Sequence, residues 1–331
     1  MTAWPRPSGI FSTWSSRTIG PQAVAPVLRL ATRGSELALW QARRTAFLLE
    51  QAHAGLEIQL VRVSTTGDRR AEVPVWEMGG QGVFVREVQA EVRSGRADAA
   101  VHSAKDLQPV PPEGLCLAAV PERADPRDAL VGATLAQLGP GCVVATGSAR
   151  RRAQLAHLVP GLEFQSLRGN IATRLSKVPE GGAIVVAMAA LARLGLQPGR
   201  LHVLSAEQVL PQVAQGALAV ECRQDDLRTR SLLAAIEDPV ARAEVDAERA
   251  YLASIGGGCE LPVAAYATTQ PDGELCLEGL LAALDGSSIS RHKTSGPPAG
   301  AADLGREVAR LVLAGGGESL LSDLAGMRRS R

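Results

Sequence analysis

Apolar and polar residues follow one another along the chain in a pattern that predicts an α/β protein from residue 28 onward. Leu28 to Thr32 form a short, mainly apolar run typical of a buried strand, and Ser35 just after it can cap a helix. Apolar side chains then recur at helical spacing over residues 39–49. Further strands are expected at residues 58–64 and 97–101, with a helix between them that follows a glycine-rich loop. This segment is therefore predicted to form one α/β unit.

A second unit of the same kind follows. Its expected elements are a strand, a helix and two further strands, at residues 142–146, 150–158, 162–167 and 183–188. The turn Ala145-Thr146-Gly147-Ser148 resembles Ala31-Thr32-Arg33-Gly34-Ser35, and each lies between a strand and a helix. We therefore expect two similar domains that face each other.

The pattern changes after Pro239. A helix is expected over residues 240–254, and three strand-like segments come after it, at residues 261–268, 274–282 and 287–294. Pro271-Asp272-Gly273 and Asp285-Gly286 separate these segments and are good hairpin turns. Two helical stretches close the chain. This part is predicted to be a small α+β domain with a three-stranded antiparallel sheet.

Composition agrees with several domains and excludes some classes of partner. The 331 residues exceed what one hydrophobic core usually serves, and 46% of them are hydrophobic. A formal net charge of +1 gives no overall field that would attract nucleic acid or an acidic membrane, so any anion site must be a local cluster. No window reaches the roughly 18 consecutive apolar residues of a membrane span.

The cysteines argue against a disulfide framework or a structural zinc site, because they are odd in number, widely spaced and without a Cys-x-x-Cys pair. A reducing cytoplasm fits best. Residues 1–27 contain four prolines, several serines and two arginines, with no acid before Glu36. They are interpreted as a disordered extension, and a transit peptide into an organelle is the alternative.

Three consecutive arginines, Arg150 to Arg152, stand at the expected start of a helix, where the helix dipole disfavours cations. No structural reason for that placement is evident in the sequence. Guanidinium groups and helix N-terminal amides together can bind carboxylates. Four other arginines also follow predicted strands or turns: Arg33 in the first α/β unit, and Arg168, Arg174 and Arg193 in the second. Each alone could be an ordinary surface arginine, but together they indicate a polyanionic ligand between two domains.

Two further residues suggest chemistry. Asp106 follows Lys105 in a loop after a strand, and it is either a surface ion-pair partner or a carboxylate that stabilises developing positive charge. Cys259 follows three glycines, which favours an accessible thiolate that acts as a nucleophile or covalent anchor. The other cysteines in apolar strand-like runs, Cys116, Cys142 and Cys276, are expected to be small buried residues.

Five segments in this order resemble those of the hydroxymethylbilane synthase (porphobilinogen deaminase) family. They are residues 31–38, His102-Ser103-Ala104-Lys105-Asp106, Ser166-Leu167-Arg168-Gly169-Asn170 with Arg174, Gln215-Gly216-Ala217 and Gly257-Gly258-Cys259. The resemblance implies two periplasmic-binding-protein-like (type II) α/β domains and a small C-terminal α+β domain. It implies domain boundaries at residues 28–122 with 214–236, at 123–213 and at 237–331.

The resemblance also implies an activity. Four porphobilinogen molecules would be condensed head to tail, with release of ammonia, on a dipyrromethane cofactor joined to Cys259 by a thioether. Asp106 would hold pyrrole N–H groups and stabilise the positive charge of the deaminated substrate. Cofactor contacts are expected from Lys105, Ser103, Thr146, Ser148, Arg150, Arg151, Arg168 and Gly169. Substrate contacts are expected from Arg33, Ser35, Arg174, Arg193, Phe84 and Gln215. The resemblance gives Arg152 no role.

A monomeric cytoplasmic enzyme of haem biosynthesis is the resulting expectation, with porphobilinogen as its partner and no nucleic acid, membrane or metal. The main alternative is a non-catalytic carboxylate-binding protein of the periplasmic-binding type, which would need neither Asp106 nor a modified cysteine. A third hypothesis is a nucleic-acid-binding protein. It is disfavoured because only 3% of residues are aromatic and the net charge is near zero.

Overall fold

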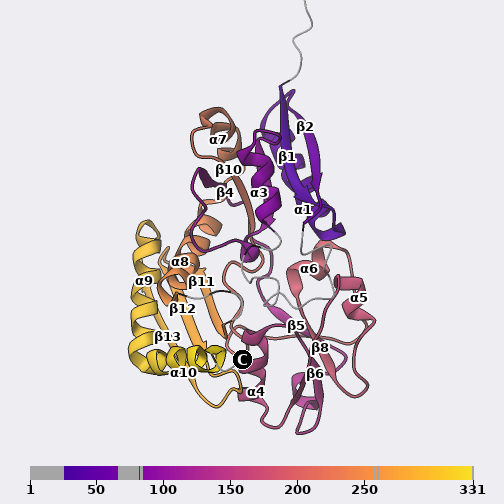
Figure 1. Ribbon diagram of the computed structural model, residues 1–331, viewed down its shortest axis with the longest axis vertical. Helices are drawn as coiled ribbons and strands as arrows, with labels where there is room; N and C mark the ends of the chain where they lie inside the picture. The colour runs from indigo at the N-terminus through magenta and orange to yellow at the C-terminus, as the bar shows by residue number, and fades with distance from the viewer. Residues whose placement is uncertain (1–25, 66–81, 83–84, 257, 259–260, 330–331) are drawn as a thin grey trace, which may run out of the picture.

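The computed structural model describes residues 26–65, 82, 85–256, 258 and 261–329, which form three sheets with their helices (Figure 1). The predictions for the N-terminal extension to residue 25, for Phe84 and for Cys259 lie outside the described residues. Within these residues no helix is both long enough and apolar enough to cross a membrane.

The first sheet has the strand order β2-β1-β3-β10-β4. Strand β1 (Val27–Arg33) pairs in parallel with β2 (Glu57–Val63) and β3 (Ala99–Ser103). Strand β10 (Leu218–Arg223) is antiparallel to both β3 and β4 (Leu115–Ala119). The helices of this part of the chain are α1 (Glu36–Ala52), α3 (Arg86–Arg93) and α7 (Leu227–Ala234). The chain thus leaves this sheet after β4 and returns to it about a hundred residues later.

The second sheet repeats the arrangement of the first, with the order β7-β6-β8-β5-β9. Strand β6 (Val143–Ala145) is parallel to β7 (Glu163–Gln165) and β8 (Ala183–Ala187), and β5 (Asp128–Val131) is antiparallel to β8 and β9 (Leu201–Val203). Its helices are α4 (Ala149–Leu158), α5 (Ile171–Leu175) and α6 (Met188–Arg193). The prediction of two similar α/β units is confirmed.

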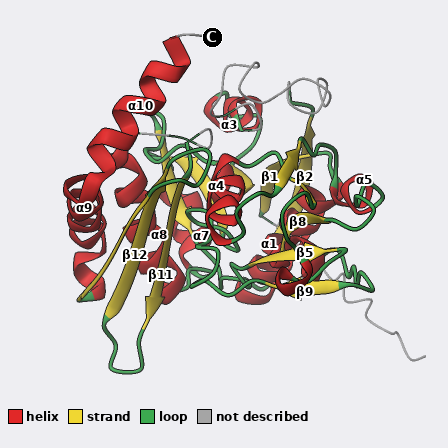
Figure 2. Ribbon diagram, turned by 90° about the horizontal axis from the view of Figure 1, so that it is seen from below, coloured by secondary structure: helices red, strands yellow, loops and turns green. Residues whose placement is uncertain are grey.

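The third sheet is antiparallel, in the order β11-β12-β13, as the hairpin turns predicted. Its strands and helices are β11 (Val263–Thr269), β12 (Leu275–Ala282), β13 (Ile289–Gly296), α8 (Pro239–Ile255), α9 (Ala301–Val312) and α10 (Glu318–Arg329). Figure 2 shows α8 and α9 beside this sheet, and their buried side chains share one apolar core with it. Short helical turns complete the described chain, at Ala104–Asp106 (η1), Leu135–Gln137 (η2), Pro298–Gly300 (η3) and Leu313–Gly317 (η4, a π-turn).

The two chain segments that cross between the α/β domains lie against each other. The Ala124 amide donates to the Gly216 carbonyl over 3.1 Å. Gly216 has a φ of +89°, and a Cβ there would lie 2.3 Å from the Ala124 oxygen, so only glycine fits. Glu248 of α8, fully buried, accepts from Ala214 N at 2.5 Å and from Arg123 Nη1 at 2.7 Å. The third domain is therefore anchored at the crossing, although the exact domain boundaries stay a prediction.

Candidate active site

The loop that carries Asp106 is held by two hydrogen bonds to its backbone. It forms the short helix η1 directly after β3, with the Ala104 amide donating to the Ala217 carbonyl over 3.1 Å. Gln212 Nε2 donates to the Lys105 carbonyl over 3.3 Å. Lys105 and Asp106 are half-buried. Because Ala217 and Gln212 belong to the segment that returns from the second domain, the loop lies where the domains join.

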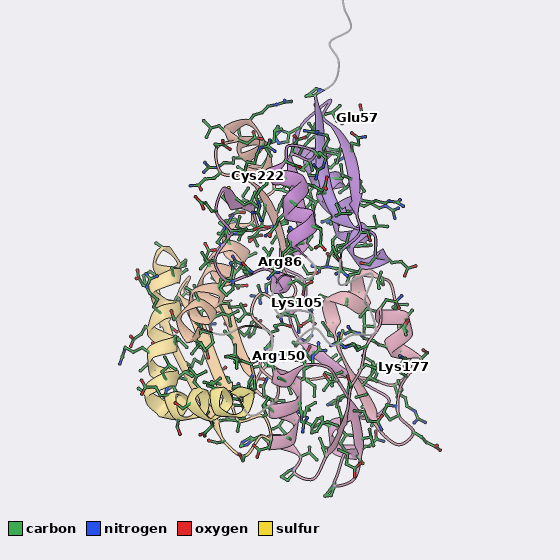
Figure 3. The ribbon with its side chains drawn as sticks, in the orientation of Figure 1. Glu57, Arg86, Lys105, Arg150, Lys177 and Cys222 are labelled. Carbon is green, nitrogen blue, oxygen red and sulfur yellow. The ribbon has the colours of Figure 1, made fainter. Side chains whose placement is uncertain are left out.

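Lys105 lies among other charged groups. Its Nζ donates to Gln215 Oε1 over 3.0 Å. Burial, together with the Arg151 guanidinium, lowers the pKa of Lys105 to about 8, although the Asp106 and Asp128 carboxylates oppose the shift. Figure 3 shows Lys105 and Arg150 at the centre of the molecule, between the ribbons of the three domains. The Lys105 side chain is therefore positively charged at neutral pH and loses that charge in mildly alkaline solution.

Asp128, at the start of β5, is the buried anion of this region. It has no exposed surface, and its carboxylate accepts hydrogen bonds from Arg150 Nη2 at 2.7 Å, Arg151 Nη2 at 2.6 Å and Gln215 Nε2 at 2.8 Å. Burial acts to raise the pKa of Asp128, but the two guanidinium groups outweigh it and hold that pKa well below its ordinary value. The carboxylate is thus ionised and fully engaged.

This ion cluster explains why two arginines stand at the start of α4. That structural reason was not evident in the sequence. Ser148 caps the helix by accepting from the Arg151 amide at 3.4 Å, and the Asp128 carboxylate compensates the cations there. Arg150 Nη1 and Arg151 Nη1 also donate to the Leu210 and Val185 carbonyls. In the described part of the chain, Arg151 Nε is buried and has no hydrogen-bond partner. Arg151 therefore keeps one donor available for a ligand.

Two more predicted arginines lie in the same region. Arg174 of α5 donates through Nε to the Gly169 carbonyl over 2.8 Å. Burial, followed by repulsion from Arg151 and Arg168, lowers the pKa of Arg174, while Asp106 attracts its charge. The structure thus brings Lys105, Asp106, Arg150, Arg151, Arg168 and Arg174 into one cluster, in which cations outnumber carboxylates.

Arg193 has a different environment from these arginines. It is 8% exposed and donates from Nη2 to the Gly216 carbonyl over 2.6 Å. Its guanidinium carbon lies 5.7 Å from the centre of the Trp40 ring of α1. Burial lowers the pKa of Arg193 to about 10. Arg193 therefore connects the second domain to α1 and to the crossing segment, and its predicted substrate contact stays a prediction.

The remaining predicted residues have mainly local partners. Ser35 caps α1 by accepting from the Ala38 amide, and Ser103 Oγ accepts from Gln41 Nε2 over 2.7 Å. Thr146 Oγ1 accepts from the Ser148 amide over 3.2 Å. Arg33 is half-buried at the end of β1. These residues lie near the ends of β1, β3 and β6, and their predicted ligand contacts stay predictions.

Two residues of the cluster were understood incompletely from the sequence. Asp128 is not among the site residues predicted from the sequence, although an acid directly before the apolar run 129–131 is a signal of a buried ion pair. Gln215, predicted to contact substrate, is fully buried and joins Lys105 to Asp128. Gln215 thus links the two α/β domains, and its predicted substrate contact stays a prediction.

Solved structures with a related chain path are known. The effector-binding domain of BenM with benzoate has a TM-score of 0.40 and 16% identity, covering 65% of this chain and 91% of that one. The methionine binding protein MetQ has a TM-score of 0.39 and 14% identity, covering 63% of this chain and 88% of that one. Values this low carry no argument about function.

Sequence comparison is decisive. The family model described as porphobilinogen deaminase, dipyromethane cofactor binding domain, matches residues 28–231, and the model of the porphobilinogen deaminase C-terminal domain matches residues 242–314. A porphobilinogen deaminase of Syntrophotalea carbinolica is 43% identical over 302 residues, which are 90% of this chain and 96% of that protein. The resemblance carried by the five motifs is confirmed, and the chain belongs to the porphobilinogen deaminase family.

Proposed function

We propose that Asp106 is the catalytic carboxylate of a transferase that condenses four porphobilinogen molecules head to tail and releases one ammonia for each. Membership of the family makes the chain an enzyme of tetrapyrrole synthesis with a dipyrromethane cofactor. The observation that supports Asp106 is the contrast with Asp128. Three side chains donate to Asp128, whereas among the described residues none donates a hydrogen bond to Asp106.

The chemistry of the donors fits the cofactor. A dipyrromethane made from porphobilinogen bears acetate and propionate groups, and the cluster offers an excess of cations, including the buried donor Arg151 Nε, which no described residue satisfies. Carboxylates placed there would offset the burial and the repulsion between cations that lower the pKa of Lys105 and Arg174. We propose that Lys105, Arg151 and Arg168 hold these carboxylates and that Cys259 forms the thioether. When bound, the dipyrromethane supplies the pyrrole primer to which substrate units are joined.

Asp106 then acts on the reacting substrate. Its carboxylate accepts hydrogen bonds from pyrrole N–H groups and stabilises the positive charge that develops as ammonia leaves. Arg174, which lies close enough to be attracted by Asp106, binds substrate carboxylates and orients the ring. While Lys105 is protonated, the Asp106 carboxylate attracts its positive charge.

The test is the Asp106→Asn variant, with Asp225→Asn on the surface as the matched control. Both variants should fold, and Asp106→Asn should lower the rate of porphobilinogen consumption by about 100-fold or more, as loss of an electrostatic stabiliser does. The intact mass of the protein without substitutions should include an adduct of two linked pyrroles, and peptide mapping should locate that adduct on the peptide containing Cys259. Normal turnover by the variant would exclude the role of Asp106, and an unmodified mass after incubation with porphobilinogen would favour a non-catalytic carboxylate-binding protein.

We further propose that the enzyme is monomeric, cytoplasmic and without a nucleic-acid partner. The nearly balanced charge of the chain supports the last point. Gel filtration with light scattering and a salt titration of DNA binding would test these statements directly.

A further inference from the structure

Two cysteines outside the active site lie directly opposite each other in the first sheet. Cys116 of β4 and Cys222 of β10 are paired residues in the antiparallel ladder, and their Sγ atoms are 3.9 Å apart. Cys222 is fully buried, whereas Cys116 is half-buried. The other free cysteines of the described residues, Cys142 and Cys276, belong to the second and third domains. The contact is therefore a specific pair of thiols.

The pair occupies a particular place in the topology. The chain leaves the first sheet after β4, forms the whole second sheet, and returns to the first sheet at β10. Cys116 and Cys222 thus lie on the two strands that flank the inserted second domain. Figure 1 shows β4 and β10 side by side in the first domain, away from the strands of the second sheet. A covalent bond between them would close a loop that contains the second domain.

We propose that Cys116 and Cys222 are a modification site at which a low-molecular-weight disulfide, such as oxidised glutathione, generates an intramolecular disulfide across β4 and β10. In the first step the Cys116 thiolate attacks the glutathione disulfide, forms a mixed disulfide and releases one reduced glutathione. In the second step the Cys222 sulfur attacks Cys116 Sγ, loses its proton to water and displaces the second reduced glutathione. Two protein thiols are oxidised and one glutathione disulfide is reduced, so electrons balance.

The geometry allows the bond. Residues directly opposite in an antiparallel pair have Cα atoms about 4.5–5.5 Å apart, within the range of about 4.4–6.8 Å that disulfides span. The sulfur atoms must approach by about 2 Å to reach bonding distance. Strand β4 is the outer strand of its sheet, so it can shift without breaking a second ladder. The Cys222 thiol, which donates to the Arg223 carbonyl over 3.4 Å, has to release that contact.

The order of the steps follows from exposure. Cys116 is reached first because it is half-buried, while burial raises the pKa of the Cys222 thiol and keeps it protonated. Oxidation should therefore be slower than that of an exposed dithiol. Once formed, the bond restrains the unfolded chain over a separation of 106 residues and should raise the melting temperature.

The test uses the full-length holoenzyme incubated with oxidised or reduced glutathione. Free thiols are then blocked with a maleimide under denaturing conditions, and the protein is analysed by intact mass and non-reducing peptide mapping. We expect the oxidised sample to carry two fewer maleimide groups, one cross-linked peptide pair containing Cys116 and Cys222, and a higher melting temperature that dithiothreitol reverses. Cys116→Ser should abolish the temperature shift, and Cys142→Ser should retain it.

Two outcomes would overturn the proposal. One is a persistent glutathione adduct on Cys116 with a free Cys222 thiol, and the other is an unchanged thiol count after prolonged oxidation. Both are measured on the unmodified sequence, so they do not depend on the folding of any variant.

Discussion

Replacing Asp128 by asparagine tests whether the buried ion cluster determines the stability of the second domain. The carboxylate has no exposed surface and accepts from two guanidinium groups at 2.7 and 2.6 Å. Asparagine has nearly the same shape, but its amide nitrogen cannot accept a hydrogen bond and it carries no charge. Arg150 and Arg151 would then be buried cations without a compensating anion.

The expected magnitude follows from these contacts. Hydrogen bonds to charged groups contribute about 1.5–3 kcal/mol each, and removing one partner of a buried ion pair costs about 3–5 kcal/mol. We therefore expect Asp128→Asn to lower the free energy of unfolding by about 3–5 kcal/mol. At about 4–8 °C per kcal/mol for a domain of 60–100 residues, the melting temperature of the second domain should fall by about 12 °C or more.

A matched control lies three residues away. Asp125 pairs with Arg127 at 2.7 Å, but these side chains are 30% and 49% exposed. Because surface ion pairs contribute about 1 kcal/mol or less, Asp125→Asn should hardly change the melting temperature. Differential scanning calorimetry or circular dichroism on both variants gives the comparison. Equal decreases in the melting temperatures of the two variants would refute the claim that burial makes the Asp128 ion cluster contribute more to stability than the surface pair.

The effect of Asp128 also has a defined pH dependence. Its folded-state pKa is held well below the value of about 3.9 in an unfolded chain, so the stabilisation is fully present above that value and is lost as pH falls toward the folded-state pKa. The difference in melting temperature between the unmodified protein and Asp128→Asn should therefore be constant from about pH 5 to pH 8 and should narrow below about pH 4. A difference that grows in acid would contradict this assignment.

Two further predictions concern Lys105 and Gly216. Because burial and the Arg151 guanidinium lower the pKa of Lys105 to about 8 when no carboxylate ligand is bound, the cofactor-free protein loses this positive charge above that pH, and its uptake of the dipyrromethane cofactor should slow through pH 8 to 9. Lys105→Gln should remove this step from the pH profile. Gly216→Ala should destabilise the protein by at least about 1–3 kcal/mol, because the Cβ would lie 2.3 Å from the Ala124 oxygen. Gly55→Ala, also at positive φ but with open space around it, should cost only about 1 kcal/mol, and equal losses of stability on denaturant titration would disprove the steric argument.

Much of the local structure could be predicted from the residues themselves. Strand β1 and helix α1 follow from an apolar run, a capping serine and helical spacing, because these signals act within a few residues. The β11–β13 hairpins follow from turn residues whose backbone preferences are intrinsic. The order of five motifs, rather than any one of them, indicated the family and hence the cofactor.

The identity and order of most elements, and the residue types of the site, could therefore be predicted from the amino-acid pattern. Three features became apparent only in the folded molecule: which strand β10 joins, that Asp128 neutralises Arg150 and Arg151, and that Cys116 faces Cys222. These contacts join residues separated by about 20 to more than 100 positions. No local preference encodes such a pairing, because register and ion-pair partners depend on how whole sheets pack and on which charges burial forces together.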